Sequence, residues 1–422
     1  MLYLQNMNLK EAELFYKKYK GKEFHMYRED ETSFNDYKNT DIPIELINKW
    51  KEEIDTIDRI YELKKDVRHL YVHVPFCNSI CYYCDFCHIT YNSNIVDKWL
   101  EYLEEEIRIN CLNQYETIYI GGGTPNCLNL KQLERLLILL NPYTDKVKEY
   151  TIEVNPESLD IDKINLFKKY HINRISIGVQ SSDDELLNKL NRKHTFSNVI
   201  DSIKLLRDNG FNNISVDLMY SLPGQDIDIL NKTIDDILSL EVPHISLYSL
   251  TVEENSVFGK RGIKSLDEDI EADMYELIEK RLKENNYIHY EVSNYCKEGY
   301  ESKHNLGYWN YNDFLGISLG ASGKLGNYRY TNTRLFDRYF DDINSKDEEV
   351  YLTKKEMMFE NIMMSLRTIY GLDINEFNRR YDVDFINEYK RQLENDKLII
   401  KDNHLICIDL EILNNILLEF LD

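Results

Sequence analysis

Between about residue 67 and residue 250, short β-branched runs alternate with longer stretches whose apolar residues recur with helical period. The runs predict six strands, at residues 69–75, 117–122, 149–155, 174–180, 213–220 and 244–250. The stretches between them predict helices at residues 94–109, 129–140, 161–170, 195–210 and 226–240. This alternation predicts an α/β fold with a parallel sheet covered by helices. Because βαβ crossovers are right-handed, we expect the sheet to curl into a partial, TIM-like (β/α)6 barrel.

The segments on either side of this barrel have a different character. Residues 1–66 are polar and charged with weak helical periodicity, and they predict an N-terminal helical extension or a solvated cap without chemistry. After about residue 290 the chain becomes rich in glycine and aromatic residues, and it then predicts helices followed by a small hairpin. We therefore expect an extension (1–66), a barrel core (67–290) and a small C-terminal α/β accessory domain (291–422).

The composition narrows the classes of partner and compartment. The chain has 422 residues, 43% of them apolar, and its formal net charge is −23. An acidic surface repels phosphate backbones, so we expect no nucleic-acid partner. The first residues lack the apolar run of a signal peptide, and no uncharged stretch reaches the length of a membrane helix. We therefore expect a cytoplasmic protein without a membrane span, in which grouped cysteines indicate a metal site before they indicate disulfides.

Four cysteines, Cys77, Cys81, Cys84 and Cys87, crowd into CNSICYYCDFC directly after the first predicted strand. A four-thiolate zinc site usually takes two C-x2-C pairs from separate turns, whereas these thiols share one loop. Disulfides are disfavoured in a reducing compartment, and a ferredoxin-like cluster takes four protein thiolates at other spacings. An iron–sulfur cube held by three thiolates, with one iron open to a small chelating molecule, is the fourth alternative.

Polar residues and glycines gather where the predicted strands end. GGGTP (121–125) follows the second strand, Glu153 ends the third, Gln180 ends the fourth, and Asp217 lies late in the fifth. In barrels of this kind the working face is at the carboxyl ends of the strands. We therefore expect these residues to share one site with the cysteine loop.

Taken together, the motifs resemble the radical S-adenosylmethionine (SAM) family that contains oxygen-independent coproporphyrinogen III oxidase (HemN) and the heme chaperones (HemW). The resemblance spans roughly residues 69–422 and lies in HLYVHVPFCNSICYYCDF, YIGGGTPNCL, TIEVNPESL, RISIGVQSSDDELLNKLNRKHT, SVDLMYSLPGQ, HISLYSLTVEEN and YEVSNYCKEGYESKHNLGYW. It implies a 4Fe-4S cluster on Cys77, Cys81 and Cys84, with SAM bound to the open iron. A fourth thiolate would occupy that iron, so we expect Cys87 not to be a ligand.

The resemblance also implies contacts to SAM and to heme. The residues expected to contact SAM are Tyr71, Tyr83, Gly122, Gly123, Thr124, Glu153, Gln180, Arg192 and Asp217. HNLGYW (304–309) resembles a heme-chaperone element, so His304 is expected to ligate heme iron, with Tyr308 and Trp309 against the porphyrin. A histidine beside aromatic residues is also often only packed and hydrogen-bonded.

Within this family the motifs favour a heme chaperone of the HemW type, with heme as cargo. The expected partners are heme or a porphyrin, an electron donor for the cluster and a heme-acceptor protein. Phe86 stands where the oxidase has an extra cysteine, which counts against the oxidase, while the N-terminal extension is unusual for a chaperone. GISLGASGKL (316–325) departs from the chaperone pattern by lacking a histidine. The alternatives are radical decarboxylation of coproporphyrinogen III and a radical SAM methyltransferase; SAM cleavage is expected in each case.

Overall fold

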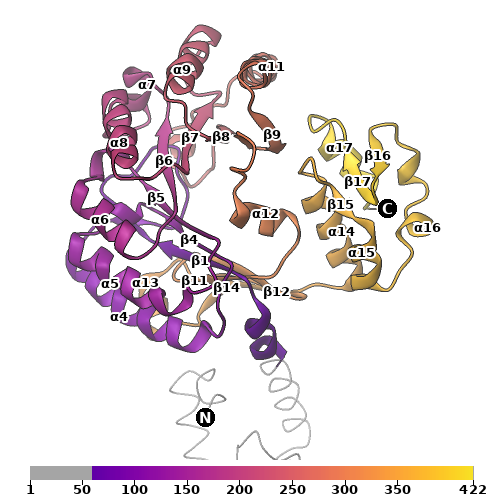
Figure 1. Cartoon of the computed structure of the whole chain (residues 1–422), viewed down its shortest axis with the longest axis horizontal. Helices are drawn as coiled ribbons and strands as arrows, with labels where there is room; N and C mark the ends of the chain where they lie inside the picture. The colour runs from indigo at the N-terminus through magenta and orange to yellow at the C-terminus, as the bar shows by residue number, and fades with distance from the viewer. Residues whose placement is uncertain (1–58, 422) are drawn as a thin grey trace, which may run out of the picture.

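The computed structural model describes residues 59–421, and its largest element is a twelve-stranded sheet. The strands follow the order β14-β13-β12-β11-β1-β4-β5-β6-β7-β8-β10-β9. The neighbouring strands from β11 to β8 are parallel: β11 (Phe314–Ile317), β1 (His69–Val74), β4 (Thr117–Gly122), β5 (Glu149–Val154), β6 (Arg174–Gln180), β7 (Ile214–Tyr220) and β8 (His244–Ser249). The six predicted strands and the curled α/β architecture are therefore confirmed, and Figure 1 shows the helices on the outer side of the sheet.

The helices predicted between the strands are also present, each beginning at a polar cap. They are α4 (Ser93–Asn110), α5 (Leu130–Leu140), α6 (Ile161–Lys169), α8 (Phe196–Asp208) and α9 (Ile227–Ser239). The Asn92 side chain accepts from the first backbone N–H groups of α4, and Asn129 forms a capping box with Gln132 at α5. The caps satisfy backbone donors that have no partner inside a helix.

One parallel strand of the large sheet was not predicted from the sequence. β11 lies beside β1, with Phe314 opposite His69 and Ile317 opposite Val72. Its four residues, FLGI, are too few to show a period, and more than two hundred residues separate it from its partner. The pairing therefore depends on tertiary structure and not on a local signal.

The remaining elements flank this sheet or form smaller units. The other strands are β2 (Phe76–Cys77), β3 (Ile89–Thr90), β9 (Ile288–Glu291), β10 (Asn294–Cys296), β12 (Ser322–Leu325), β13 (Tyr328–Asn332), β14 (Lys346–Tyr351), β15 (Leu372–Asp373), β16 (Leu398–Lys401) and β17 (His404–Cys407). The other α-helices are α7 (Asp184–Lys189), α10 (Val257–Lys260), α11 (Glu268–Glu284), α12 (Lys303–Trp309), α13 (Phe336–Asp341), α14 (Lys354–Ser365), α15 (Ile374–Tyr381), α16 (Phe385–Glu388) and α17 (Leu413–Leu418). Short 3-10 turns are η2 (Pro125–Cys127), η3 (Asn141–Tyr143), η4 (Pro156–Ser158) and η5 (Gln392–Glu394).

Side-chain alternation divides the parallel strands into an apolar outer face and a polar inner face. In β1, Leu70, Val72 and Val74 are fully buried in the main hydrophobic core. The alternate residues of the parallel strands form the inner face: His69, Tyr71, His73, Thr117, Tyr119, Glu149, Glu153, Arg174, Ser176, Ser215, Asp217 and His244. The interior of the curled sheet is thus lined with groups that can hold polar ligands and with hydrogen-bonded networks.

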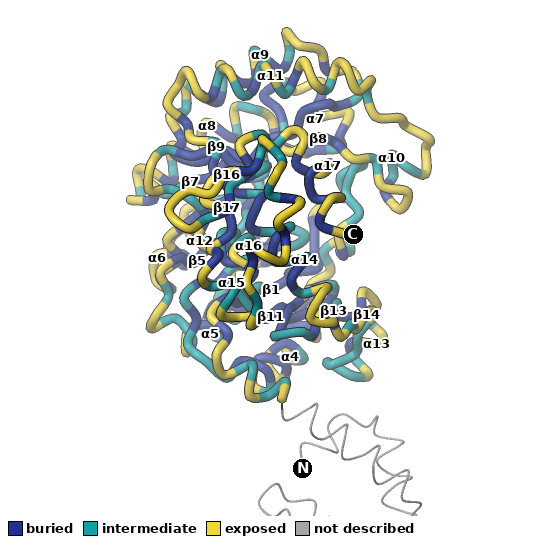
Figure 2. Tube along the Cα trace, turned by 90° about the vertical axis from the view of Figure 1, so that its right-hand side faces the viewer, coloured by how far each residue is buried: buried dark blue, intermediate teal, exposed yellow. Residues whose placement is uncertain are grey.

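A second hydrophobic core begins near residue 358 and belongs to the C-terminal unit of α14 to α17 and the β15-β17-β16 sheet. In Figure 1 this unit lies on the concave side of the large sheet, across α12, and in Figure 2 it faces the viewer. Strands β12 to β14, as far as residue 351, still belong to the large sheet. We therefore propose that the accessory domain begins near residue 352, because the expected division after residue 290 falls inside β9.

The predicted N-terminal extension lies almost wholly outside the described residues. Only residues 59–66 are described, and they form a short helical segment that leads into β1. Among residues 59–421, no helix combines the length and the apolar character that crossing a bilayer requires.

Candidate cofactor site at the carboxyl ends of the strands

The cysteine loop leaves the carboxyl end of β1 and is held in place by backbone hydrogen bonds. The short strand β2 contains Cys77 and pairs in parallel with β3. The Tyr82 N–H donates to the Leu190 carbonyl, and the Cys84 N–H donates to the Cys81 carbonyl. Cys77 is buried, whereas Cys81 and Cys84 are half-buried. The three thiols predicted to bind iron therefore lie on one anchored loop.

Every cysteine of the chain is a free thiol in the structure. Burial raises the pKa of Cys77 and of Cys84, to about 11 and about 12 respectively. Both sulfurs therefore carry protons at neutral pH unless a nearby positive charge stabilises the thiolate, as a bound metal does. Among the described residues, no group of three or more His, Cys, Asp or Glu side chains has the geometry of a single-ion site.

Cys87 contacts residues far along the chain from the cysteine loop. Its Sγ lies 3.7 Å from the Arg334 carbonyl oxygen, and its side chain packs against Gly320, where a Cβ would lie 2.4 Å from the Cys87 Cβ. The Cys87 carbonyl accepts from His73 Nε2 at 2.7 Å. Its surroundings are therefore those of a packed side chain that anchors the end of the loop.

Two predicted SAM contacts lie against the sulfur atoms. The Thr124 hydroxyl donates to Cys77 Sγ at 3.4 Å, and the Arg192 guanidinium donates to Cys81 Sγ at 3.6 Å. Arg192 also donates to the Asn155 side-chain oxygen at 2.9 Å and to the Gly178 carbonyl. Arg192 is 8% exposed, although its charged sequence neighbourhood, NRKHT, is equally compatible with a surface position.

Although burial opposes the charge of Arg192, electrostatic interactions with Tyr83, Cys81 and Glu157 hold its pKa above the ordinary value. The Arg192 Nε has no hydrogen-bond partner in the described part of the chain. A buried cation with an unpaired N–H is the type of group that binds a carboxylate or a thiolate. The residue thus fits the edge of a cluster and the carboxylate of a small ligand.

The glycine run packs its backbone directly against the cysteine loop. The Gly123 N–H donates to the Val74 carbonyl at 2.8 Å, and the Thr124 N–H donates to the Phe76 carbonyl at 2.7 Å. A Cβ on Gly123 would lie 2.5 Å from the Phe76 oxygen, and Gly122 adopts a φ of +114°. Both positions therefore require glycine for this approach of two backbones.

The inner-face carboxylates lie close to this run. Glu153 accepts from the Tyr119 hydroxyl at 2.7 Å and from the Gly122 N–H at 3.1 Å. Burial, with the neighbouring Asp217 as a smaller cause, raises the pKa of Glu153 to about 7. Asp217 accepts from the Ser176 hydroxyl at 3.1 Å, and burial also raises its pKa. A nearby cation, such as a sulfonium or an ammonium group, would favour the ionised form of both.

The other predicted SAM contacts also lie at this end of the barrel. Gln180 ends β6 with a φ of +71°, at a bulge in its pairing with β7. The Tyr71 hydroxyl is hydrogen-bonded to His73 Nδ1 at 2.9 Å, and its ring lies 6.1 Å from that of Tyr119. Tyr83 lies between the cysteines and packs near Leu190 and Phe258. The structure therefore brings the predicted ligand set together around one loop.

The predicted heme residues lie on α12, within the concave side of the sheet (Figure 1), where the His304 ring is 5.2 Å from that of Tyr119. His304 is 1% exposed; its Nδ1 is hydrogen-bonded to the Thr117 hydroxyl at 2.7 Å and its Nε2 to the Tyr308 hydroxyl at 2.7 Å. Burial lowers the pKa of His304 well below its ordinary value. The imidazole is thus neutral with both nitrogens occupied, and Trp309 follows on the same helix.

Some residues that hold α12 were missed by the sequence reasoning. The Glu149 carboxylate at the start of β5 accepts from the backbone N–H groups of Lys303 and His304, each at 2.9 Å. His69 is hydrogen-bonded through Nδ1 to the same Thr117 hydroxyl, at 2.8 Å. The alternation of polar residues on the predicted strands was a signal for these positions, but not for their partners on a distant helix.

The comparisons with known proteins agree with this geometry. Residues 71–237 match the Radical SAM superfamily model, and residues 352–411 match the HemN C-terminal domain model. Membership in that superfamily implies a 4Fe-4S cluster and SAM. Among solved structures, coproporphyrinogen III oxidase (HemN) from Escherichia coli has the same fold, with a TM-score of 0.76 at 20% identity, covering 86% of this chain and 92% of the oxidase.

Several relatives bear the name heme chaperone HemW. The Lactococcus lactis protein is 39% identical over 366 residues, which cover 83% of this chain and 96% of that relative. The Bacillus subtilis protein is 37% identical over 332 residues, covering 75% of this chain and 87% of that relative. The Escherichia coli protein is 34% identical over 263 residues, 61% of this chain and 70% of its own. With the cysteine loop, the curled sheet and the HemN-type C-terminal domain, these similarities show that the chain belongs to the HemW family of radical SAM proteins.

Proposed function

We propose that this protein is a heme chaperone that holds a 4Fe-4S cluster and SAM, binds heme as cargo and passes it to an acceptor protein. The observation that carries the proposal is the similarity to the Lactococcus lactis heme chaperone, which extends over 96% of that relative. The motifs that resemble this family lie in the cysteine loop, around it, and on α12.

The residues around the loop fit such a cluster. Cys77, Cys81 and Cys84 would hold it. Burial raises the pKa values of Cys77 and Cys84, so the charge of an iron core would be needed to stabilise their thiolates. Thr124 and Arg192 would donate to the bound sulfurs, as they do to the thiols. When bound, such a cluster supplies an electron for cleavage of the sulfonium of SAM, and an external donor must replace that electron.

The remaining predicted contacts have complementary chemistry for SAM. Glu153 and Asp217 are carboxyl groups that would face its cationic groups, and Arg192 is the buried cation that suits its carboxylate. Gly122 and Gly123 would offer backbone, while Tyr71, Tyr83 and Gln180 line the same end of the barrel. Their half-buried position leaves them accessible to a small molecule.

The heme part of the proposal includes the sequence-based contacts Tyr308 and Trp309. Ligation of iron by His304 would require it to exchange one of its two present hydrogen bonds for the metal. Heme bound beside α12 would lie near the SAM contacts, because the His304 ring is 5.2 Å from that of Tyr119, which donates to Glu153.

Cysteine variants test the cluster assignment. Anaerobically reconstituted wild-type protein is expected to bind about four irons per chain, and Cys81→Ala is expected to lose them. Cys87→Ala is the matched control and should keep its iron, because Cys87 packs against Gly320 and Arg334. Iron analysis with electron paramagnetic resonance measures both variants. Equal iron loss in the two variants would contradict the three-thiolate assignment.

The oxidase is the second candidate function, since the chain has the fold of HemN over 86% of its length. Anaerobic incubation with coproporphyrinogen III, SAM and a reductant tests it. Under the chaperone proposal, mass spectrometry should detect no decarboxylated porphyrinogen, while a heme titration should shift the Soret band. Detection of a decarboxylated product without a Soret shift would favour the oxidase function over the chaperone function.

A further inference from the structure

The imidazole of His73 lies buried on the inner face of β1, four residues before Cys77. Its Nε2 lies 2.7 Å from the Cys87 carbonyl oxygen, and its Nδ1 lies 2.9 Å from the Tyr71 hydroxyl. His73 was not among the residues predicted to contact SAM. It nevertheless connects the end of the cysteine loop to Tyr71, which is among them.

These two contacts fix the positions of the protons between them. A carbonyl oxygen can only accept, so Nε2 carries the proton of His73 and donates it to Cys87. Burial lowers the pKa of His73 to about 4, so the ring is neutral at pH 7 and Nδ1 has a lone pair. The Tyr71 hydroxyl must therefore donate to Nδ1. A hydroxyl has one proton, so the Tyr71 oxygen can only accept from any further group.

Glu153 is a second acceptor in the neighbourhood of Tyr71. Burial, and after it the nearby Glu153, raise the pKa of Tyr71 well above its ordinary value, so the hydroxyl keeps its proton. Without His73, the most favourable acceptor for that proton would be the Glu153 carboxylate, whose charge it would partly neutralise. Because His73 holds the proton, Tyr71 and Glu153 both present lone pairs, and two neighbouring acceptors attract a cation.

The glycine run gives this arrangement its space. A Cβ on Gly122 would lie 2.8 Å from the His73 ring, while the Gly122 N–H donates to Glu153 at 3.1 Å. A Cβ on Gly121 would lie 2.9 Å from the Glu153 carboxyl carbon. Strands β1, β4 and β5 are neighbours in this order, so the histidine, the glycines and the carboxylate form one row across the sheet. The His73 ring is therefore packed against the Gly122 backbone beside Tyr71.

We propose that His73 is a positioning residue for SAM, which holds the Tyr71 proton and so keeps Tyr71 and Glu153 as paired acceptors for a cationic group of SAM. This inference rests on the proposed function, in which the site binds SAM, and assigns a role to a residue that acts through Tyr71. SAM has two cationic groups, a sulfonium and an ammonium, and lone pairs attract both. The carboxylate of SAM would be repelled by the same pair.

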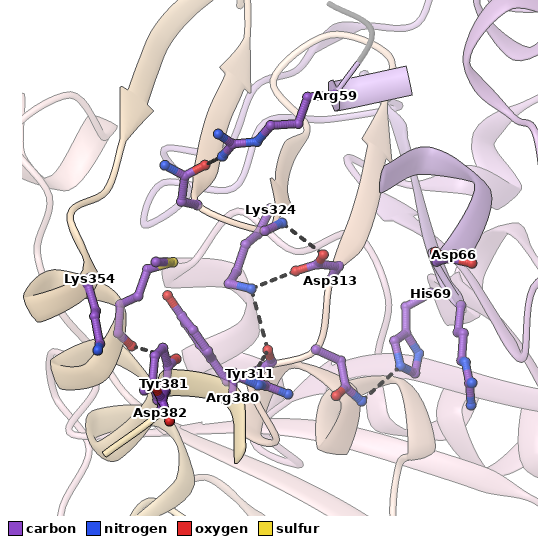
Figure 3. A pocket seen from close by; sticks show the side chains of 15 residues that line it. Arg59, Asp66, His69, Tyr311, Asp313, Lys324, Lys354, Arg380, Tyr381 and Asp382 are labelled. Atoms are coloured by element: carbon purple, nitrogen blue, oxygen red, sulfur yellow. Dashed lines mark hydrogen bonds and ion pairs between the residues drawn. The ribbon is translucent and has the colours of Figure 1, made fainter. Parts of the chain in front are cut away.

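His69 offers a matched control on the same strand. It is also a buried inner-face histidine, and burial likewise lowers its pKa to about 4. It lies four residues earlier, roughly 13 Å away along extended chain. There it lines a polar cavity of about 750 Å³ at the amino end of β1, shown in Figure 3, and its partners are Thr117 and Asn312. His69 thus shares the burial and charge state of His73 without a hydrogen bond to Tyr71.

Two substitutions separate the two hydrogen bonds of His73. His73→Gln keeps an N–H that can reach the Cys87 carbonyl but lacks the acceptor at Nδ1, whereas His73→Asn keeps an oxygen near Nδ1 but is too short to reach Cys87. SAM binding to anaerobically reconstituted full-length protein is measured by calorimetry. His73→Gln and Tyr71→Phe are expected to weaken it by about tenfold or more. His73→Asn and His69→Gln should stay within about twofold of the wild type.

The double variant Tyr71→Phe/His73→Gln tests whether His73 acts through Tyr71. Its affinity for SAM should equal that of Tyr71→Phe, because without the hydroxyl there is no proton to direct. S-adenosylhomocysteine, which has an ammonium but a neutral sulfur, identifies the cation. If His73→Gln binds this analogue as the wild type does, the sulfonium lies at the paired acceptors. An equal loss for both molecules places the ammonium there.

A second measurement does not depend on the cluster. Heteronuclear NMR of protein with isotope-labelled histidine reports which ring nitrogen is protonated, and the signals of His73 are those that disappear in His73→Gln. They should show a neutral ring with its proton on Nε2. A proton on Nδ1 would overturn the proposal, because Nδ1 would then donate to Tyr71 and leave the hydroxyl proton free.

The outcomes distinguish the inference from the proposed function. Iron content and circular dichroism verify that each variant is loaded and folded. If loaded wild-type protein binds no SAM, the SAM part of the proposed function itself fails. If it binds SAM and His73→Gln binds equally well, the positioning role is wrong while the function stands. A further tenfold loss on adding His73→Gln to Tyr71→Phe would also overturn the proposal, since His73 would then act independently of Tyr71.

Discussion

At the residue scale, Arg192 links the cysteine loop to the barrel through donors that point in different directions, to Asn155, Gly178 and Cys81. A lysine cannot reproduce this fork of N–H groups. Because N–H···S hydrogen bonds stabilise the reduced form of a cluster, Arg192→Lys should lower the cluster's reduction potential by on the order of tens of millivolts. A redox titration followed by electron paramagnetic resonance measures this shift, with the exposed neighbour Lys193→Met as control. An unchanged potential in Arg192→Lys would show that the guanidinium does not reach the bound thiolate.

At the scale of elements, α12 is positioned by a carboxylate from another strand. Glu149 is 1% exposed and accepts from two backbone N–H groups at the start of this helix. Glu149→Ala leaves those buried donors unpaired and should lower the free energy of unfolding by about 2–3 kcal/mol. Urea denaturation measures the loss, and hydrogen exchange should rise at residues 303–306. Glu149→Gln keeps an acceptor and should cost less, while Glu116→Gln, which breaks only surface ion pairs, should cost under about 1 kcal/mol. If Glu149→Ala were as stable as the wild type, Glu149 would not cap α12.

At the scale of the whole molecule, neutral histidines buried on the inner face make the free energy of unfolding depend on pH. Burial lowers the pKa values of His69 and His73 to about 4, whereas the ordinary value is near 6.5. The unfolded chain therefore binds more protons than the folded chain between these values. Each histidine makes its full contribution to the free energy of unfolding above pH 6.5. This contribution is lost as the pH falls towards 4, by up to about 3 kcal/mol per histidine. Glu153 and Glu291, whose pKa values burial raises to about 7, act in the opposite sense.

Comparing wild-type protein with a His73 variant separates the effect of one histidine on stability from the effect of the carboxyl groups. Urea unfolding of wild-type and His73→Gln protein at pH 7 and pH 5 should show a smaller loss on acidification in the variant, because glutamine does not titrate. The exposed His171→Gln serves as control and should leave the pH dependence unchanged. Parallel curves for wild type and His73→Gln would contradict the neutral, buried state of His73.

The six long parallel strands were predictable because their outward-facing residues are apolar and turn residues bound each run. β11 was not, because its four residues carry no period and its partner lies far away in the sequence. The set of residues around the cysteine loop followed from strand ends that meet at one edge of the sheet. Arg192 was different, since NRKHT is compatible with a surface arginine and only the packing of the barrel buries it.

By itself, the sequence determined the chemistry of the loop: four thiols within eleven residues must share one neighbourhood however the rest of the chain folds. Periodicity likewise determined the alternation of strands and helices, because the interior of the fold selects apolar side chains at regular intervals. Only the tertiary structure decided that Cys87 packs against Gly320 and that both nitrogens of His304 are occupied. The physical reason is that burial, hydrogen bonding and local field come from residues far apart in the chain, which a local pattern does not record.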